Sequence, residues 1–269
     1  MRLKSKHENT QEEWLRAWEN PYRAGLTKEK LEEMERDAIR FIKEEAEGSV
    51  LCGHSFGKDS LVLHDLCKRA GHPKGIYGAS IGEFPSLVEY RKRHNNGDIE
   101  ILMSDKDFDW LVKRGEPFVR SAKDRMAYHR NTVTNPINRY LDKHKVDTYI
   151  VGRRWADGNN VPKSKIMYRG KHKTKVLHPI AEWSQEAILA YLQKYNIELP
   201  SMYFMECSGF DYGTSVWPMM NIRDRSVEDQ WRLLWKDEPK IVIEASKYFE
   251  SALKILEEKV NEEMGKHNE

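Results

Sequence analysis

Cysteine is scarce in this chain of 269 residues, which has only Cys52, Cys67 and Cys207 and no Cys-x-x-Cys pair. An odd, sparse set of thiols excludes an obvious disulfide framework and is typical of a reducing compartment. The chain also lacks an apolar run of about 18 residues, the length that a transmembrane helix needs. Its first residues lack the apolar region of a signal peptide. We therefore expect a cytoplasmic protein with no membrane partner.

Neither sign of charge dominates the chain. The 45 Lys and Arg residues nearly balance the 43 Asp and Glu residues, so the formal net charge is +2. A near-neutral chain gives no whole-protein case for binding nucleic acid or a membrane surface. The sequence contains no internal repeat and no low-complexity segment. With 39% hydrophobic residues, it can bury one good core and a small appendage.

The Gly-x-x-x-x-Gly-Lys spacing of a Walker loop is missing, yet residues 55–60, Ser-Phe-Gly-Lys-Asp-Ser, have the features of a phosphate site. An apolar run precedes this segment and a helical pattern follows it. Gly57 lets the backbone approach an anion closely, and the first turn of a helix favours negative charge. Lys58 adds a cation, and Ser55 and Ser60 add hydroxyl donors. We predict a phosphate-binding turn.

Asp59 is the unusual member of this segment, because a carboxylate repels an anion. Two interpretations stay open at this point. The carboxylate could ligate Mg²⁺ that is bound to a pyrophosphate group, or it could cap the amino end of the helix.

A second glycine turn falls at residues 75–85, where an apolar run ends at Ser80 and Gly82 and a helical pattern follows. This order is typical of a strand, a turn and a helix. On its own, the segment is equally consistent with a plain structural turn and with part of a binding site.

A third strand end carries two arginines. The β-branched and aromatic run at 147–151 predicts a buried strand, and Gly152, Arg153 and Arg154 follow it directly. Arginine offers two parallel donors to phosphate or sulfate. Open α/β sheets bind ligands beyond the carboxyl ends of their strands. We therefore predict that both arginines contribute to function.

A fourth stretch, residues 177–188, begins a helix at Ser184, which is a good N-cap, and Glu186 in the first turn complements the helix dipole. Trp183 falls on the apolar face of this pattern. We expect it to anchor the core rather than to react.

These four stretches, with a continuation through residues 196–203, resemble the phosphoadenosine phosphosulfate reductase-like group of the N-type ATP pyrophosphatases, whose phosphate-binding segment is called the PP-loop. The group has the adenine nucleotide alpha hydrolase-like fold and includes sulfonucleotide reductases and the small subunit of bacterial ATP sulfurylase. The resemblance covers about residues 48–203. Ser80 and Ile81 stand where the family has Asp and Thr.

The resemblance implies that ATP is split at its α-phosphate, so that a substrate is adenylated and pyrophosphate leaves. It implies a nucleotide-binding set and a catalytic set. The first consists of Ser55, Phe56, Gly57, Lys58, Ser60, Ser80, Gly82 and Gly152; the second of Lys58, Asp59, Arg153 and Arg154, with Asp59 orienting Mg²⁺. ATP, or a sulfonucleotide in its place, and Mg²⁺ are the expected cofactors.

Two other functions remain open. A sulfonucleotide reductase needs a nucleophilic cysteine, which the family carries near its carboxyl terminus, and Cys207 is the one candidate here. The cysteine pairs that hold an iron–sulfur cluster in some relatives are missing, so we expect no cluster. Alternatively, the chain is a nucleotide-binding subunit of a sulfur-transfer or nucleic-acid-modification complex, with a protein partner or a second copy of itself.

A basic loop is expected at residues 163–175, where seven cationic or histidine side chains occur with hardly an acidic one. A charge run of this kind is either solvated surface or a lid over a polyanion. The polyanion would be a small anionic substrate or a nucleic-acid backbone.

The alternation of strand and helix patterns from residue 49 to residue 150 predicts a doubly wound parallel sheet of the α/β class. We expect a helical N-terminal extension at 1–47, broken at Pro21, a PP-loop domain at 48–203 and a mainly helical C-terminal region at 204–269. A long helix is predicted over about 121–144 and further helices over about 226–264.

Overall fold

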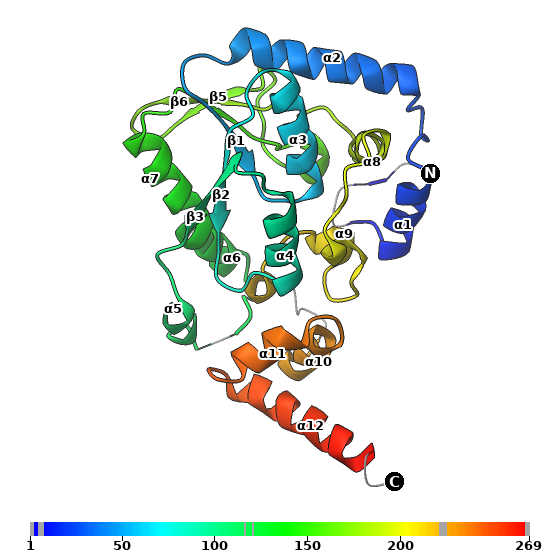
Figure 1. Ribbon diagram of the computed structural model, residues 1–269, viewed down its shortest axis with the longest axis vertical. Coiled ribbons are helices and arrows are strands. Elements are labelled where there is room, and N and C mark those ends of the chain that lie inside the picture. The colour runs from blue at the N-terminus through cyan, green and yellow to red at the C-terminus, as the bar shows by residue number, and fades with distance from the viewer. Residues whose placement is uncertain (1–2, 5–7, 116, 120, 221–224, 267–269) are drawn as a thin grey trace. The chain divides into compact units, whose positions relative to one another are not determined.

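The computed structural model describes residues 3–4, 8–115, 117–119, 121–220 and 225–266. A six-stranded sheet lies at its centre, in the order β3-β2-β1-β4-β6-β5 (Figure 1). The strands are β1 (Val50–His54), β2 (Gly75–Ala79), β3 (Ile99–Met103), β4 (Thr148–Ile150), β5 (Ile166–Arg169) and β6 (Thr174–Leu177). The predicted α/β class is confirmed.

The strand order places a reversal of direction between β1 and β4. Strands β1 to β3 extend the sheet one way, and the chain then returns to add β4 on the other side of β1. β1 pairs in parallel with both β2 and β4, and β4 pairs in parallel with β6. In open α/β sheets, ligands bind outside the carboxyl ends of the strands at such a reversal. The segments that follow β1 and β4 are therefore the first place to look for a site.

The basic loop expected at residues 163–175 is partly an edge hairpin: residues 166–169 and 174–175 lie in strands, whereas residues 163–165 and 170–173 lie in turns. β5 pairs antiparallel with β6 at the edge of the sheet, with Met167 opposite Val176. Many of the cations have carboxylate partners: Lys165 pairs with Glu182 at 2.6 Å and Lys175 with Glu45 at 2.8 Å.

The described residues form two compact units. The first comprises Met1–Gly78, His94–Leu102 and Asn135–Pro200. Its helices are α1 (Gln11–Glu19), α2 (Lys28–Glu45), α3 (Lys58–Arg69), α7 (Asn135–Lys143) and α8 (Gln185–Lys194). Thr10 and Thr27 cap α1 and α2, so the predicted pair of helices with Pro21 between them is confirmed.

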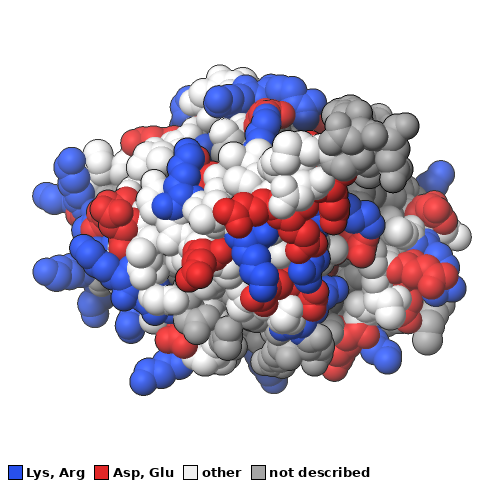
Figure 2. All heavy atoms as spheres, turned by 90° about the horizontal axis from the view of Figure 1, so that it is seen from below, with Lys and Arg blue, Asp and Glu red and all other residues white. Residues whose placement is uncertain are grey.

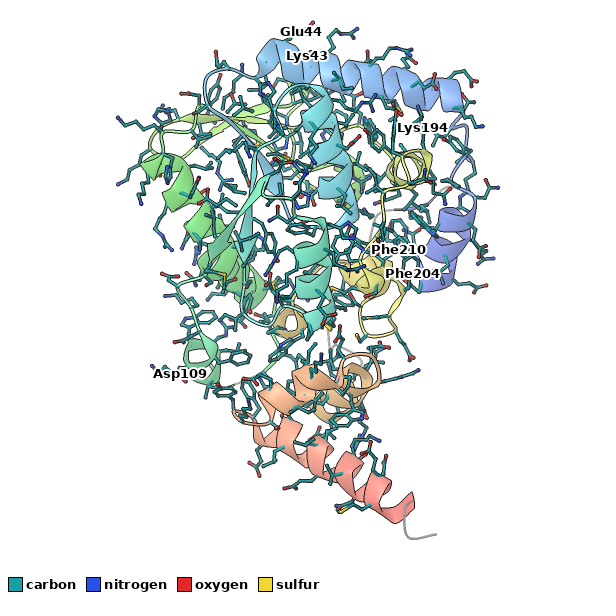
Figure 3. All side chains as sticks on the ribbon, viewed as in Figure 1. Lys43, Glu44, Asp109, Lys194, Phe204 and Phe210 are labelled. Carbon is teal, nitrogen blue, oxygen red and sulfur yellow. The ribbon has the colours of Figure 1, made fainter. Side chains whose placement is uncertain are left out.

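A buried carboxylate links three helices of this unit. Glu35 of α2 is 3% exposed and accepts hydrogen bonds from Lys194 at 3.0 Å and from the Tyr195 hydroxyl at 2.7 Å. Arg69 of α3 lies 3.5 Å from the Glu35 oxygen that accepts from Tyr195. Figure 3 labels Lys194 on α8. Because the buried charge has partners, it does not destabilise the packing of α2 and α3 against α8.

The second unit comprises Ala79–Arg93, Met103–Thr134 and Ser201–Glu269. Its helical elements are α4 (Pro85–His94), α5 (Phe108–Val112), α6 (Ala122–His129), a π-helical turn (Arg130–Thr134), α9 (Gly209–Tyr212), α10 (Val227–Asp237), α11 (Pro239–Ala245) and α12 (Glu250–Lys266). Phe118, Trp217 and Trp231 form an aromatic core, with ring centroids 4.6–5.7 Å apart. Phe204 and Phe210 meet edge to face at 5.9 Å (Figure 3).

The helices predicted over about 121–144 and 226–264 are present. In the first, the π-helical turn connects α6 to α7 without a break in the helical run. The second is divided into α10, α11 and α12. Pro239 begins α11 at its first position and so separates it from α10.

The surface carries both signs of charge. Figure 2 shows Lys and Arg side chains intermingled with Asp and Glu on the face that it displays. This agrees with the formal net charge of +2. No helix in the described part of the chain is long and apolar enough to cross a membrane.

Candidate functional site

The segment that follows β1 is a tight turn built around Phe56. The φ angle of Phe56 is +55°, in the left-handed region that non-glycine residues seldom adopt. Its N–H donates to Nδ1 of His54 at 3.0 Å, and its ring packs against Tyr77 at 5.3 Å. Burial holds the pKa of His54 well below its usual value, so the ring is neutral and Nδ1 can accept. These contacts hold the strained backbone in place.

The hydroxyl groups of Ser55 and Ser60 brace the same turn. Ser60 Oγ donates to the carbonyl of Gly57 at 2.9 Å and accepts from the N–H of Ser55 at 3.1 Å. Gly57 is the N-cap of α3 and supplies no side-chain cap. The amino end of α3 thus begins in a preformed turn, with the helix dipole favouring an anion there.

Lys58 does not extend into solvent. Its side chain is 1% exposed, and Nζ lies 2.9 and 2.8 Å from the two carboxylate oxygens of Asp59. A further hydrogen bond joins Nζ to Oε1 of Gln185 at 3.2 Å. The ammonium group is therefore paired with a carboxylate in this structure.

Arg154 shares the same carboxylate. Its side chain is completely buried, and Nη2 lies 2.9 Å from Asp59 and 2.9 Å from Asp157. The same nitrogen donates to Gln185 at 2.7 Å, and Nη1 donates to the carbonyl of Trp183 at 3.0 Å. Two cations, Lys58 and Arg154, thus face two carboxylates, Asp59 and Asp157, and the formal charges of this buried cluster cancel.

Gly152 allows the segment after β4 to approach the first turn of α3 closely. A Cβ at this position would lie 3.3 Å from the carbonyl oxygen of Asp59, closer than side chains usually approach a backbone oxygen. The absence of a side chain therefore allows the segment after β4 to pack against the first turn of α3. The sequence-predicted residues Gly152, Arg154, Asp59 and Lys58 meet at this point.

Arg153 differs from Arg154 in exposure and in ion pairing. Its side chain is exposed. The ion pairs among the described residues include none to Arg153. Its charge is felt nearby, since together with burial it lowers the pKa of Arg169 and of His178.

His178 was missed by the sequence-based reasoning. It is 1% exposed, and neither ring nitrogen has a hydrogen-bond partner among the described residues. Burial, and then the charge of Arg153, lower the pKa of His178 to about 4, so the ring is neutral at pH 7. Its position directly after β6 was the available signal. Asp157 and Gln185 were missed as well, although each lies beside a residue that had been singled out.

Two residues predicted to bind the nucleotide, Ser80 and Gly82, belong to the second unit. Gly82 has a φ of +76°, and a Cβ there would lie 2.4 Å from Pro218. Its carbonyl accepts from the N–H of Trp217 at 3.0 Å. Glycine at this position is thus required by the packing of the second unit. The predicted nucleotide contacts of Ser80 and Gly82 stay a prediction.

Cys207, the candidate thiol nucleophile, is buried in the second unit. Burial and the nearby carboxylate of Asp237 raise its pKa far above the usual value. The backbone N–H of Cys207 donates to that carboxylate at 2.8 Å. A thiol in this environment is a poor source of thiolate. Cys52 and Cys67 are buried as well.

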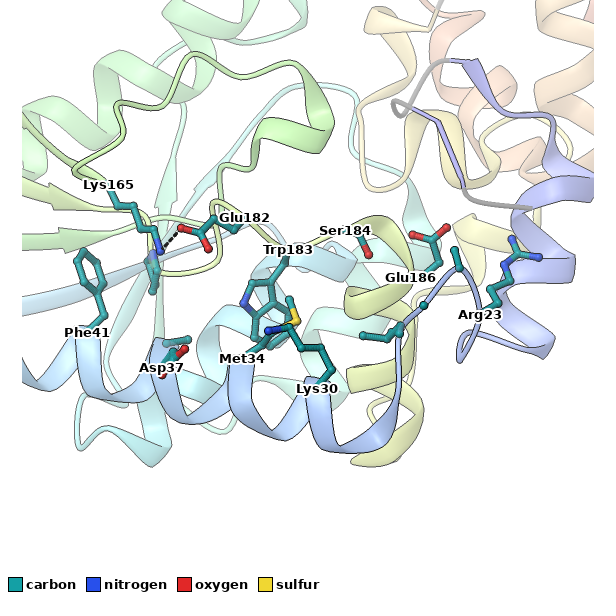
Figure 4. A pocket seen from close by; sticks show the side chains of 15 residues that line it. Arg23, Lys30, Met34, Asp37, Phe41, Lys165, Glu182, Trp183, Ser184 and Glu186 are labelled. Atoms are coloured by element: carbon teal, nitrogen blue, oxygen red, sulfur yellow. Dashed lines mark ion pairs between the residues drawn. The ribbon is translucent and has the colours of Figure 1, made fainter.

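A pocket of about 340 Å³ lies elsewhere in the first unit, beside α2 (Figure 4). Trp183, Met34 and Phe41 supply its apolar wall, and the ion pair between Lys165 and Glu182 borders it. The sequence-predicted nucleotide residues do not line this pocket. Trp183 is 3% exposed and contacts Tyr191 at a ring distance of 5.6 Å, as expected of a core anchor.

Asp59 is the residue that the sequence predicted as a contact for Mg²⁺. No group of three or more His, Cys, Asp or Glu side chains in the described part of the chain could hold a metal ion. Mg²⁺ commonly uses one or two protein carboxylates with substrate phosphates and water, and Asp59 fits that pattern. Both of its oxygens are engaged by cations in this structure.

A tight turn at the amino end of a helix lies beside an arginine-bearing strand end, at the reversal point of a mostly parallel sheet. This arrangement defines an α/β protein with a mostly parallel six-stranded sheet. Residues 49–210 match the phosphoadenosine phosphosulfate reductase domain family. The chain belongs to that family, which confirms the resemblance seen in its motifs.

Similarity to individual proteins is lower. Sulfate adenylyltransferase subunit 2 of Shewanella loihica is 25% identical over 209 residues, which are 65% of this chain and 68% of that protein. The protein of the same name from Phocaeicola vulgatus is 24% identical, over 65% of this chain and 67% of the relative. The crystal structure of a phosphoadenylyl-sulfate reductase from Candida auris, a phosphate complex, matches with a TM-score of 0.50 and 14% identity. It covers 67% of this chain and 92% of that chain, and this likeness shows the shared fold.

Proposed function

We propose that the chain is an ATP-dependent enzyme that binds the phosphates of ATP at residues 55–60 and splits the nucleotide between the α and β phosphates. An oxygen of the acceptor substrate would attack the α-phosphorus, the bond to the β-phosphate would break, and pyrophosphate would leave. The observation that carries the proposal is the preformed turn between β1 and α3, with Gly57 as an N-cap that has no side chain. Membership of the family supports it.

The role of α3 in this proposal is to hold the departing pyrophosphate. Negative charge grows on the leaving group, and the amino end of a helix stabilises it without reorganisation. The strained backbone of Phe56 and the bracing hydroxyls of Ser55 and Ser60 keep the turn in place before ATP arrives. Positioning supplies much of the rate in reactions of this kind.

Lys58, Asp59 and Arg154 act as a unit in this proposal. Asp59 is held between the two cations, so Lys58 reaches the phosphates only when the cluster rearranges. Arg154 is a positioning residue that fixes the carboxylate. Mg²⁺ would enter with the nucleotide and neutralise phosphate charge, and Asp59 is the described carboxylate placed to contact it.

The relatives suggest a link to sulfur and a partner. Two of them are named as subunits of a sulfate adenylyltransferase. We propose an anionic acceptor and a partner subunit for this chain on that basis. Thiol-dependent reduction is less well supported, because Cys207 is buried and its pKa is raised.

The test is a product analysis. The purified protein would be incubated with Mg²⁺ and ATP labelled at the α-phosphate, with and without sulfate, and the products separated by thin-layer chromatography. We expect AMP or an adenylate together with pyrophosphate. ADP and orthophosphate as main products would overturn the proposal. Release of sulfite from phosphoadenosine phosphosulfate would favour the reductase.

Variants connect the products to the loop. Gly57→Val and Lys58→Ala should each weaken ATP binding by about 1–3 kcal/mol, the range for a lost charged hydrogen bond. Lys68→Ala is the matched control, because Lys68 lies on the same helix in its last turn and is 38% exposed. Equal calorimetric affinity of all three variants would contradict the placement of the phosphates.

A further inference from the structure

The pocket beside α2 has an apolar wall and lies within the first unit (Figure 4). α2 supplies Met34, Ala38 and Phe41, whose spacing places them on one face of the helix. The segment before α8 supplies Trp183, which is buried like Ala38. A volume of about 340 Å³ is that of a pocket for a small organic molecule.

Charges of both signs line the pocket in equal number. The three cations and three carboxylates are Arg23, Lys30, Lys165, Asp37, Glu182 and Glu186. Four of these six side chains are already engaged. Lys165 pairs with Glu182 at 2.6 Å, and Lys30 and Asp37 each pair with another residue of α2, at 2.8 and 2.7 Å. Arg23 and Glu186 remain, and neither has an ion pair in the described part of the chain.

Arg23 is held by a tight turn. Its carbonyl accepts from the N–H of Leu26 at 3.1 Å, and Ala24 within the turn has a φ of +56°, in the left-handed region that non-glycine residues seldom adopt. The Nε atom of Arg23 is buried and has no hydrogen-bond partner among the described residues. Because buried donors normally have a partner, this guanidinium is placed to donate to a group that enters the pocket.

Glu186 supplies a carboxylate to the same pocket. Its side chain is 1% exposed, and Oε1 accepts from the backbone N–H of Leu3 at 2.5 Å. No other described residue donates to this carboxylate. Figure 4 shows Arg23 and Glu186 toward one side of the pocket, with no ion pair drawn between them, and the Lys165–Glu182 pair toward the other. A guanidinium and a carboxylate thus line one pocket without neutralising each other.

We infer that this pocket binds a free α-amino acid with an apolar side chain. The carboxylate of the amino acid pairs with Arg23, its ammonium group pairs with Glu186, and its side chain packs on Trp183 and Met34. A zwitterion fits such a site because each of its charges meets an opposite charge that has no other ionic partner. The residues proposed to hold ATP do not line this pocket, so the inference goes beyond the proposed function and does not depend on it.

The experiment measures binding to the wild-type protein by calorimetry. The probes are L-leucine, L-methionine and L-phenylalanine, each beside two analogues that lack either the ammonium group or the carboxylate; for L-phenylalanine these are 3-phenylpropionate and 2-phenylethylamine. We expect an amino acid to bind and both of its analogues to bind about tenfold more weakly or worse, since each loses a charge-assisted hydrogen bond. In ¹⁵N spectra, the indole signal of Trp183, identified by its loss in Trp183→Phe, should shift with the amino acid.

Variants separate the two charged contacts from a structural role. Arg23→Gln should weaken the amino acid and the analogue that keeps the carboxylate about tenfold, and leave the amine analogue unchanged. Glu186→Gln should do the reverse. Arg36→Gln and Glu44→Gln are the matched controls, because both residues are exposed on α2 and lie outside the pocket. Arg23 is only partly buried, so its variant carries the test even where Glu186→Gln does not fold.

Two results would overturn the inference. The first is the absence of both heat and a Trp183 shift with all three amino acids, in a sample that circular dichroism shows to be folded. The second is equal affinity for an amino acid and for its analogue without the ammonium group, since the site would then recognise a simple carboxylate. Neither result bears on the products formed from ATP, so a failure here is distinct from a failure of the proposed function.

Discussion

Replacing Arg154 by Met tests whether the buried cluster beneath the loop is structural. Arg154 is completely buried, and its Nη2 atom lies within 2.9 Å of both Asp59 and Asp157. Removing one partner of a buried ion pair typically destabilises a protein by about 3–5 kcal/mol. Asp59 keeps Lys58 and is 28% exposed, and Asp157 keeps the amide of Gln185. We therefore expect the lower end, about 3 kcal/mol.

The assay is urea unfolding followed by tryptophan fluorescence and circular dichroism. In thermal unfolding, the same loss of about 3 kcal/mol in the free energy of unfolding corresponds to a fall in Tm of about 6–12 °C for a chain of this size. The neighbouring substitution Arg153→Met is the control, because Arg153 is exposed and without an ion pair among the described residues. Surface changes of this kind alter stability by about 0.5 kcal/mol or less.

For anion binding, we expect the larger effect from the substitution of Arg153 rather than from that of Arg154. Arg153→Met should lose affinity for anions at nearly unchanged stability. A loss below about 1 kcal/mol in Arg154→Met, at an unchanged m-value, would refute the structural role. So would equal destabilisation by the two substitutions.

Three further outcomes follow from the structure. The pKa of His178 lies at about 4 in the folded protein, below the unfolded value, so the unfolded state binds more protons as the pH falls from about 6.5 to about 4. Wild-type protein should lose up to about 3 kcal/mol more stability than His178→Gln over that window, and parallel pH profiles in urea titrations would contradict this. The three buried thiols should resist Ellman's reagent in the native protein and react in denaturant. Rapid reaction of Cys207 in the native protein would support the alternative hypothesis of thiol-dependent reduction. Gly53→Ala should lower stability by about 1–3 kcal/mol by overpacking, since a Cβ there would lie 2.4 Å from the Tyr149 hydroxyl; an unchanged melting temperature would show that the neighbour gives way.

The sequence predicted the elements that depend on local pattern. The turn at Gly57, the strand before Gly152 and the helix that begins after Ser184 are all present, because glycine conformations, β-branched runs and N-caps act over a few residues. The partners of the charged residues could not be predicted in this way. In the sequence, Lys58 and Arg154 are equally consistent with ligands of phosphate. In the structure both pair with Asp59, and Gly152 allows the close approach of the two segments that carry them.

The edge hairpin and His178 were hidden for a related reason. The lysines around Tyr168 suggested a solvated loop, because their pairing with Glu182 and Glu45 depends on distant parts of the chain. An unsatisfied imidazole is likewise a property of its surroundings. Histidine at the end of a strand carries no mark in the sequence that it will lack a partner.

The position of β1 and β4 inside the sheet has a consequence for how the protein moves. Each is hydrogen-bonded to a strand on both sides, so their amides should be among the last to exchange with deuterated solvent. The turn at residues 55–60 and the segment after Ile150 are carried by these two slowly opening strands. At the proposed site, a nucleotide would therefore enter and leave while the two strands stay closed, and ligand exchange would be separated in time from the opening of the sheet.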